Sequence, residues 1–355
     1  MHQITLIHIY THNIYILGSV IDIHIYTYVL ILMSQQRMVY QQNWSAYDKS
    51  QITEKTKFIE LLTDLLQNVE ESEYGFGRPK IAMRDMLFAS AFKVYTQVSL
   101  RRFMSDLENA NKLGLITHTP CFASMGHFIQ SKELTPILKM LIILSSLPLR
   151  LVEVKFAVDS TGFKTTKFGE YCKQKHKTNS YHKWLKAHVC CGVKTNIITA
   201  VEVSGENDND SPYLDMLITT THNNGFTISE VSADKGYTSQ YNIDRIWQLG
   251  AIPFIPFKIN TRTPEGGNTW SEMYGFFMQH QKEFMRHYHL RSNIETTFFM
   301  IKSKFNETLK GKTLTAQVNE LLLKFLCHNI VVLIHETNEL GINTELNNLP
   351  MRNLV

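Results

Sequence analysis

Residues 288 to 302 carry four polar side chains at helical spacing. They are Tyr288, Arg291, Glu295 and Lys302, separated by steps of three, four and seven residues. Side chains at these steps share one face of an α-helix, so we predict a helix that presents a carboxylate between cations along about 21 Å of its axis. Such a face suits phosphate chemistry, although Arg291 and Glu295 also have the spacing of an ordinary surface ion pair.

Two aspartates upstream follow segments that are predicted to be strands. Asp159 ends the alternating run 154–158, and Asp234 ends the run 228–233. A glycine follows each aspartate within three residues and lets the backbone turn sharply. Open sheets hold their ligand sites where strands end, so the two carboxylates are candidates for a site shared with Glu295. Taken singly, each aspartate is also consistent with turn capping or a solvated surface.

The segments around these acids predict an α/β arrangement. Strands are expected at 152–158, 185–193, 197–203, 228–233 and 251–257, with helices at 211–222, 238–249 and around Glu295. The second and third strands are joined by a short turn and must be antiparallel, whereas the helical crossover favours a parallel partner for the strand before Asp234. If that strand pairs with the first, Asp159 and Asp234 emerge side by side, and the late helix can lay Glu295 against them.

The order of elements and the three acids resemble the ribonuclease H-like catalytic domain of DDE transposases from prokaryotic insertion sequences. The phrases VDSTGF, SADKGY and YHLRSNIETTF stand where that family has its acidic motifs. The Tyr-x2-Arg-x3-Glu-x6-Lys spacing is similar to the signature of one large group within it. The resemblance covers roughly residues 75–335. It implies a ribonuclease H-like mixed sheet flanked by helices.

The resemblance also implies a chemistry for the acids. Asp159, Asp234 and Glu295 are expected to be catalytic and to bind two Mg²⁺ ions, for which Mn²⁺ can substitute. Clustered carboxylates repel one another unless cations neutralise them, and Mg²⁺ prefers oxygen ligands. Two such ions can activate water or a 3′-hydroxyl for displacement at phosphorus. The implied reaction is cleavage of DNA strands at the element ends followed by strand transfer into target DNA.

Several cations and one aromatic residue are candidates for DNA contacts. Arg291 and Lys302 lie about one and two turns from Glu295 and are expected to hold phosphates beside the scissile bond. Tyr288 is expected to bind a phosphate or stack on an unpaired base, although an aromatic at helical spacing is more often packing. The stretch 164–186 is the most basic in the chain and is expected to bind the DNA backbone, although most lysine runs are solvated loops. Its candidate contacts are Lys173, Lys175, Lys177, Lys183 and Lys186.

The chain is expected to have four parts. Residues 1–37 carry no Lys or Arg before Arg37 and place polar residues inside their apolar run, so they are expected to be neither a signal peptide nor a membrane span but an extension outside the fold. Residues 38–150 are expected to form an all-α N-terminal domain that binds the DNA ends, with a packing or dimerisation domain as the alternative. Residues 151–337 are the expected catalytic domain, and 338–355 a tail. The helices expected in the N-terminal domain are 53–69, 83–97, 99–110 and 131–146.

Composition bounds the class of protein and its surroundings. The chain has 355 residues, 44% of them hydrophobic and 19% charged, which fits a folded protein with a sizeable core and excludes a disordered chain. The net charge of +4 is only mildly basic, so the distribution of charge matters more than its total. The five cysteines show no CxxC spacing, which indicates a reducing cytoplasm and no disulfide or zinc framework.

Three functions remain open from the sequence. The first is a cytoplasmic, nucleoid-associated transposase whose implied partners are double-stranded DNA (terminal inverted repeats and target) and a second copy in a homodimer, with no membrane. The second is a ribonuclease H-like nuclease without strand transfer, which the cations of the signature argue against. The third is a decayed remnant that only binds DNA, which the three intact acids argue against.

Overall fold

The computed structural model describes residues 43–71, 80–165, 184–262 and 266–347. The chain divides into two compact units, Met1–Trp44 and Ser45–Val355. Nearly all of the first unit, including the expected extension 1–37, lies outside the described residues. The fold that follows is that of the second unit.

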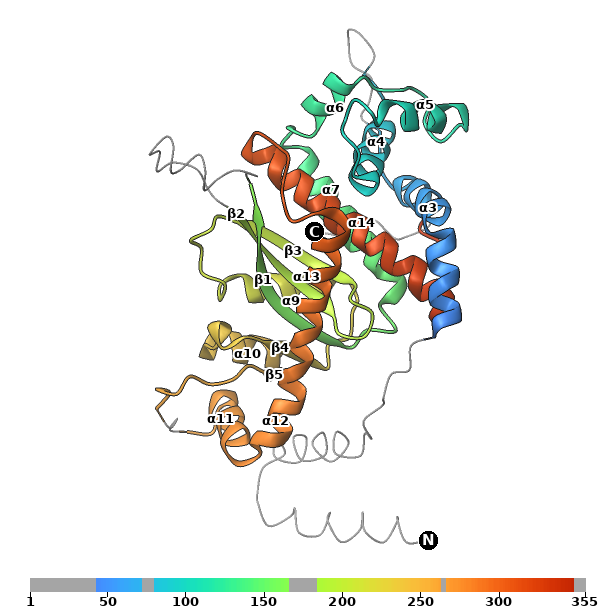
Figure 1. The fold of residues 1–355 in the computed structure, drawn as a ribbon. Coiled ribbons are helices and arrows are strands. Elements are labelled where there is room, and N and C mark those ends of the chain that lie inside the picture. The colour runs from blue at the N-terminus through green and yellow to red at the C-terminus, as the bar shows by residue number, and fades with distance from the viewer. Residues whose placement is uncertain (1–42, 72–79, 166–183, 263–265, 348–355) are drawn as a thin grey trace, which may run out of the picture. The chain divides into compact units, whose positions relative to one another are not determined.

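A five-stranded mixed sheet organises the second unit (Figure 1). Its spatial order is β3-β2-β1-β4-β5. β1 pairs antiparallel with β2 and β2 with β3, whereas β4 runs parallel to β1 and β5 parallel to β4. The predicted hairpin and the predicted parallel crossover are both confirmed. The strands are β1 (Lys155–Lys164), β2 (Trp184–Gly192), β3 (Ile198–Ser204), β4 (Glu230–Ala233) and β5 (Ile252–Phe254).

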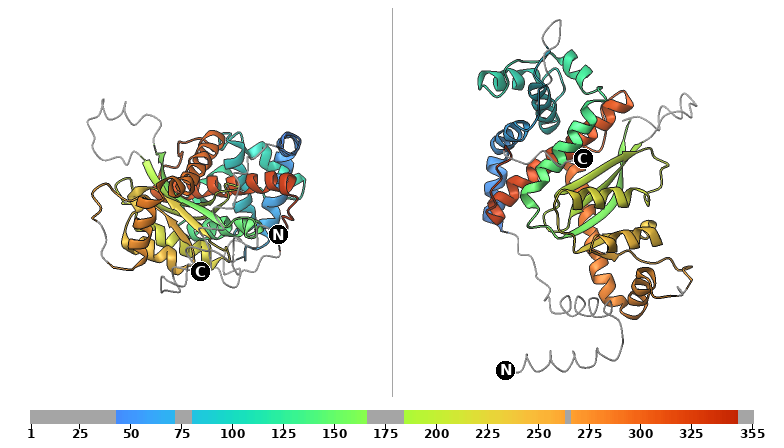
Figure 2. Two further views of the ribbon diagram at one scale, coloured as in Figure 1. Left: turned by 90° about the horizontal axis from the view of Figure 1, so that it is seen from below. Right: turned by 180° about the vertical axis from the view of Figure 1, so that it is seen from behind.

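Helices cover both faces of this sheet, as the two opposed views show (Figures 1 and 2). Phe163 of β1 packs edge-to-face on Phe325 of α14, and His188 of β2 stacks on Tyr213 of α9. His188 lies opposite Ser160 in the β1–β2 register, and residues 160 and 163 of one strand point to opposite faces. The helices around the sheet are α9 (Tyr213–Asn223), α10 (Gln240–Gln248), α13 (Ser292–Phe305) and α14 (Leu314–Leu340).

The N-terminal part of the second unit is helical, as predicted. The helix expected at 99–110 begins only at Met104, because residues 99–103 form a turn closed by the Phe103 N–H, which donates to the Ser99 carbonyl. The elements are α3 (Trp44–Leu66), α4 (Met83–Thr96), α5 (Met104–Lys112), α6 (Phe122–Phe128), α7 (Leu134–Ser146) and the 3₁₀ turn η1 (Leu147–Leu149). α6 was not predicted from the sequence.

One apolar core joins these helices to the sheet. It includes Phe88 of α4, Leu138 of α7, Phe156 of β1 and Leu326 of α14, all at most 2% exposed. The division at residue 150 into an end-binding and a catalytic domain stays a prediction.

Helix α14 is the centre of this core. The Thr313 hydroxyl caps its first turn by accepting the Ala316 N–H, and Gly341 ends it in the left-handed conformation (φ 66°) that glycine adopts without strain. Among the described residues it is the one helix long and apolar enough to cross a membrane, and 89% of its most apolar window is buried inside the protein. That burial is typical of the core helix of a globular domain.

Two helices between β5 and α13 were not predicted. They are α11 (Thr269–Gln279) and α12 (Gln281–Tyr288), which form a separate small core with the sheet edge. The helix expected at 211–222 begins at Tyr213 as α9, with Pro212 as its N-cap residue and no side-chain cap.

Candidate active site

Asp159 and Asp234 lie side by side where the parallel β1–β4 pairing ends. The last paired residues are Val158 and Ala233, and each aspartate is the next residue along its chain. Burial raises the pKa of Asp159, and the nearby charge of Asp234 raises it further, although Arg291 opposes the shift. The two carboxylates therefore share one electrostatic environment.

The prediction that Asp159 ends its strand was wrong. β1 continues past Asp159 to Lys164, because it goes on pairing with β2 and places Asp159 opposite Val189. Only the parallel pairing with β4 stops at Val158. Asp159 thus projects from a strand that is held on one side, which fixes its backbone more firmly than a loop would.

The prediction of one continuous helix over residues 288–302 was wrong, because the segment consists of three elements. α12 ends at Tyr288, the 3₁₀ turn η3 covers His289–Arg291, and α13 begins at Ser292. The apolar side chains of Ile294, Phe298, Ile301 and Phe305 lie along one side of α13 and are buried. The tighter turn still leaves Arg291 one turn before Glu295.

Arg291 bridges two of the three acids. Its Nη1 lies 2.5 Å from Asp159 Oδ2, and its Nη2 lies 2.6 Å from Glu295 Oε1. Its guanidinium also lies 5.8 Å from the ring centre of Tyr288, whose hydroxyl donates to Asp234 Oδ1 at 3.5 Å. Five of the residues singled out from the sequence therefore form one connected network.

Lys302 lies beside β1 and contacts it at Thr161, two residues beyond Asp159. Its ammonium donates to Thr161 Oγ1 at 2.7 Å and lies 5.3 Å from the ring centre of Phe163. Burial lowers the pKa of Lys302. Thr161 was not singled out from the sequence, and its hydroxyl holds the Lys302 ammonium beside β1.

The donor set suits a divalent cation. Three carboxylates supply the oxygen ligands that Mg²⁺ prefers, and the raised pKa of Asp159 marks a place where added positive charge would be favourable. Asp159 and Glu295 approach the same guanidinium from two sides, so both reach one cationic group. Within the described ranges, no three carboxylate, histidine or cysteine groups already converge as metal ligands.

Residues 151–330 match the family described as the transposase DDE domain, which is just over half of the chain. The chain belongs to the DDE transposase family. Among curated proteins, no match to the chain is found. Members of the family generally use divalent metal ions and act on DNA, and the mixed sheet with its flanking helices is consistent with their ribonuclease H-like fold.

The basic stretch of this DDE transposase is only partly described. Lys173, Lys175, Lys177 and Lys183 lie outside the described residues. Lys186 lies on β2, where its ammonium is 3.0 Å from Asp210 Oδ1 and donates to the Asp208 carbonyl at 2.9 Å. Its charge holds the loop after β3, and its expected contact with DNA stays a prediction.

One tyrosine near the acids was not singled out from the sequence. Tyr237 follows Asp234 by three residues in the phrase SADKGY and is 1% exposed. Burial raises the pKa of Tyr237, and the charge of Asp159 adds to the shift. Its place three residues after an acid that ends a strand is the sequence feature from which Tyr237 could have been predicted to lie near the site.

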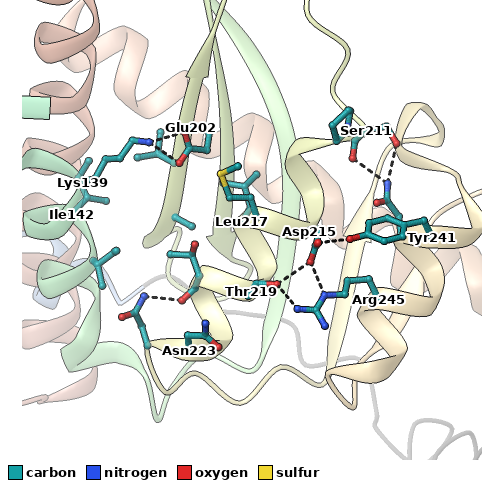
Figure 3. A pocket seen from close by; sticks show the side chains of 18 of the residues that line it. Lys139, Ile142, Glu202, Ser211, Asp215, Leu217, Thr219, Asn223, Tyr241 and Arg245 are labelled. Atoms are coloured by element: carbon teal, nitrogen blue, oxygen red, sulfur yellow. Dashed lines mark hydrogen bonds and ion pairs between the residues drawn. The ribbon is translucent and has the colours of Figure 1, made fainter. Parts of the chain in front are cut away.

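The transposase also has a cavity of about 810 Å³ whose lining includes none of the three acids. Figure 3 shows the side chains that line it. α7, β3, α9 and α10 line it. Lys139 pairs with Glu202 on one wall, and Asp215 binds both Arg245 and Tyr241 on the other. Among the predicted site residues that the structure describes, none lines this cavity.

Proposed function

We propose that this protein cuts DNA strands at the ends of its own element and joins the freed 3′ ends to target DNA. The observation that carries the proposal is the network in which Arg291 joins Asp159 to Glu295 while Asp234 lies at the next strand. Asp159, Asp234 and Glu295 would hold two divalent ions, Mg²⁺ or Mn²⁺. When bound, such ions activate the attacking oxygen and stabilise the leaving oxygen at phosphorus.

The chain's own side chains would orient the DNA. Arg291 presents a fork of N–H donors that matches phosphate oxygens, so a phosphate can replace a carboxylate as its partner. Lys302 would hold a second phosphate from its place beside Thr161. The Tyr288 hydroxyl is 3.5 Å from Asp234 Oδ1, and Tyr288 would bind a phosphate or stack on an unpaired base there.

The larger assembly is also part of the proposal. The helical region before β1 would bind the terminal inverted repeats of double-stranded DNA, and two copies would meet on that DNA as a homodimer. The lysines of residues 164–186 would follow the DNA backbone, because clustered cations bind phosphates irrespective of sequence.

Purified protein incubated with DNA that carries the element ends, plus Mg²⁺ and a target plasmid, tests the proposal. The expected products are nicked or cut ends with a free 3′-hydroxyl, followed by DNA joined to the plasmid. Cleavage without joined product would indicate a nuclease that lacks strand transfer. Binding without cleavage in Mg²⁺ or Mn²⁺ would indicate a remnant that only binds DNA.

A further inference from the structure

A buried carboxylate lies at the far end of the strands that carry the two aspartates. Glu230 begins β4, and its side chain is 4% exposed. Its Oε1 lies 2.8 Å from Lys155 Nζ, and its Oε2 lies 2.7 Å from His287 Nδ1. We call Lys155, Glu230 and His287 the Glu230 cluster.

The cluster draws one residue from each element that leads to a catalytic acid. Lys155 lies on β1 four residues before Asp159, and Glu230 lies four residues before Asp234. Lys155 and Glu230 are also direct partners in the parallel register. Residues four apart on a strand point to the same face, about 13 Å apart. The cluster and the two aspartates therefore lie at two ends of one strand pair.

The third member lies on α12, the helix that precedes η3 and the helix carrying Glu295. His287 lies on α12 four residues before Arg291, the residue that bridges Asp159 and Glu295. The next residue, Tyr288, donates to Asp234. Two consecutive residues of α12 thus contact the two ends of β4, which fixes both the rotation of the helix and its position along the strand.

The cluster is a specific contact and not a loose surface pair. The His287 side chain is 6% exposed, and its ring stacks on Phe254 of β5 with the ring centres 4.5 Å apart. Burial by itself would raise the pKa of Glu230, but His287 and Lys155 outweigh it and hold that pKa below its ordinary value. If Glu230 lost Lys155 or His287, its buried charge would be left without a partner, which is strongly destabilising. The folded protein therefore favours the arrangement of β1, β4 and α12 in which both pairs form.

We propose that Glu230 is a positioning residue that, through Lys155 and His287, holds the three elements carrying Asp159, Asp234 and Glu295 at the separation that DNA cleavage requires. This inference rests on the proposed function of that site. A shift of about 1 Å in a catalytic group can cost about 100-fold in rate, so a small movement of α12 is enough to matter.

Glu230→Gln tests the proposal, because it removes the charge and keeps the shape. The matched control is Glu153→Gln, which changes another buried carboxylate (1% exposed) that accepts the Thr195 and Lys194 N–H groups at the turn after β2. Single-turnover cleavage at saturating DNA and Mg²⁺ is expected to fall about 10- to 100-fold in Glu230→Gln and to change little in Glu153→Gln. DNA affinity should stay within about twofold of wild type in both.

Mn²⁺ binding, measured by electron paramagnetic resonance on the protein–DNA complex, gives a readout besides cleavage. Weaker Mn²⁺ binding in Glu230→Gln but not in Glu153→Gln supports the proposal, and equal rates and equal Mn²⁺ affinities in the two variants overturn it. If Glu230→Gln fails to fold, His287→Gln takes its place with the same expectations. A wild-type protein that binds DNA but never cuts it would refute the proposed function, and the Mn²⁺ comparison would still decide the role of the Glu230 cluster.

Discussion

Replacing Lys302 by alanine is expected to slow DNA cleavage about 10- to 100-fold while leaving the fold intact. The Lys302 ammonium is 2.7 Å from Thr161 Oγ1, two residues and so about 7 Å along β1 from Asp159. A phosphate in contact with this ammonium would lie next to the divalent ions that Asp159 would hold.

The size of the effect follows from the charge and its surroundings. Two unit charges about 4 Å apart interact by about 4 kcal/mol at an effective dielectric constant of 20. Lys302 is only half-buried, so solvent screening reduces this to about 1.4 to 2.7 kcal/mol, and each 1.36 kcal/mol corresponds to about tenfold in rate. Burial already disfavours the charged form of Lys302, since it lowers the pKa, so loss of the charge should cost little stability.

Lys304→Ala is the matched control. Lys304 lies on the same helix, but its ammonium is 2.7 Å from Glu54 of α3, and the helical period places it on the face opposite Glu295. Single-turnover cleavage of end DNA and urea unfolding should be measured for both variants. Equal cleavage rates for Lys302→Ala, Lys304→Ala and wild type would refute the placement of Lys302 against a phosphate, as would a loss of cleavage in Lys302→Ala that merely follows unfolding.

Two further predictions concern the basic stretch and the core. Replacing Lys173, Lys175 and Lys177 by glutamine should flatten the plot of log affinity against log salt by about 0.9 per lost phosphate contact and weaken all DNA sequences about equally; an unchanged slope would assign these lysines to solvated surface. His328 is buried with its Nε2 2.9 Å from the Asn196 carbonyl oxygen, and burial lowers its pKa to about 4. Its neutral form is therefore favoured in the folded state, so the free energy of unfolding should hold above about pH 6.5 and fall by up to about 3 kcal/mol as the pH drops to 4. His328→Gln should remove that part of the pH dependence in urea titrations, and an unchanged dependence would contradict this reading.

The sheet and its acids could be predicted because their signals are local. Alternating apolar residues predict strands, and a hairpin turn or a helical crossover fixes whether neighbours run antiparallel or parallel. Those two rules bring Asp159 beside Asp234 if the strand before Asp234 pairs with the first strand, and the β1–β4 register confirms that pairing. The buried stripe of α13 follows in the same way from a period of 3.6 residues.

The length of β1 could not be read from its own residues. Ser160, Thr161 and Gly162 resemble the start of a turn, but β2 continues to pair with them and keeps them extended. Pairing with a distant segment overrode the local preference. The 3₁₀ turn η3 could not be predicted either. Side chains three, four and seven residues apart share one face whether or not one turn of the helix is 3₁₀.

The Glu230 cluster lay beyond sequence reasoning for a different reason. Lys155 and Glu230 become partners only once the strand register is known, and His287 joins them from 57 residues further on. Its three members come from three elements, and the sequence pattern of none of these elements predicts the contact. The helices α11 and α12 were missed because their apolar residues face a separate small core.

Cleavage by Asp234→Ala is the most direct measurement of the central claim. The variant should bind end DNA with wild-type affinity and unfold at a similar urea concentration, because Asp234 lies past the last paired residue of β4. Its single-turnover cleavage in Mg²⁺ or Mn²⁺ should be undetectable, whereas Asp244→Ala on α10 should cut like wild type. Wild-type cleavage by Asp234→Ala would contradict the assignment of the three acids and the proposed function built on them.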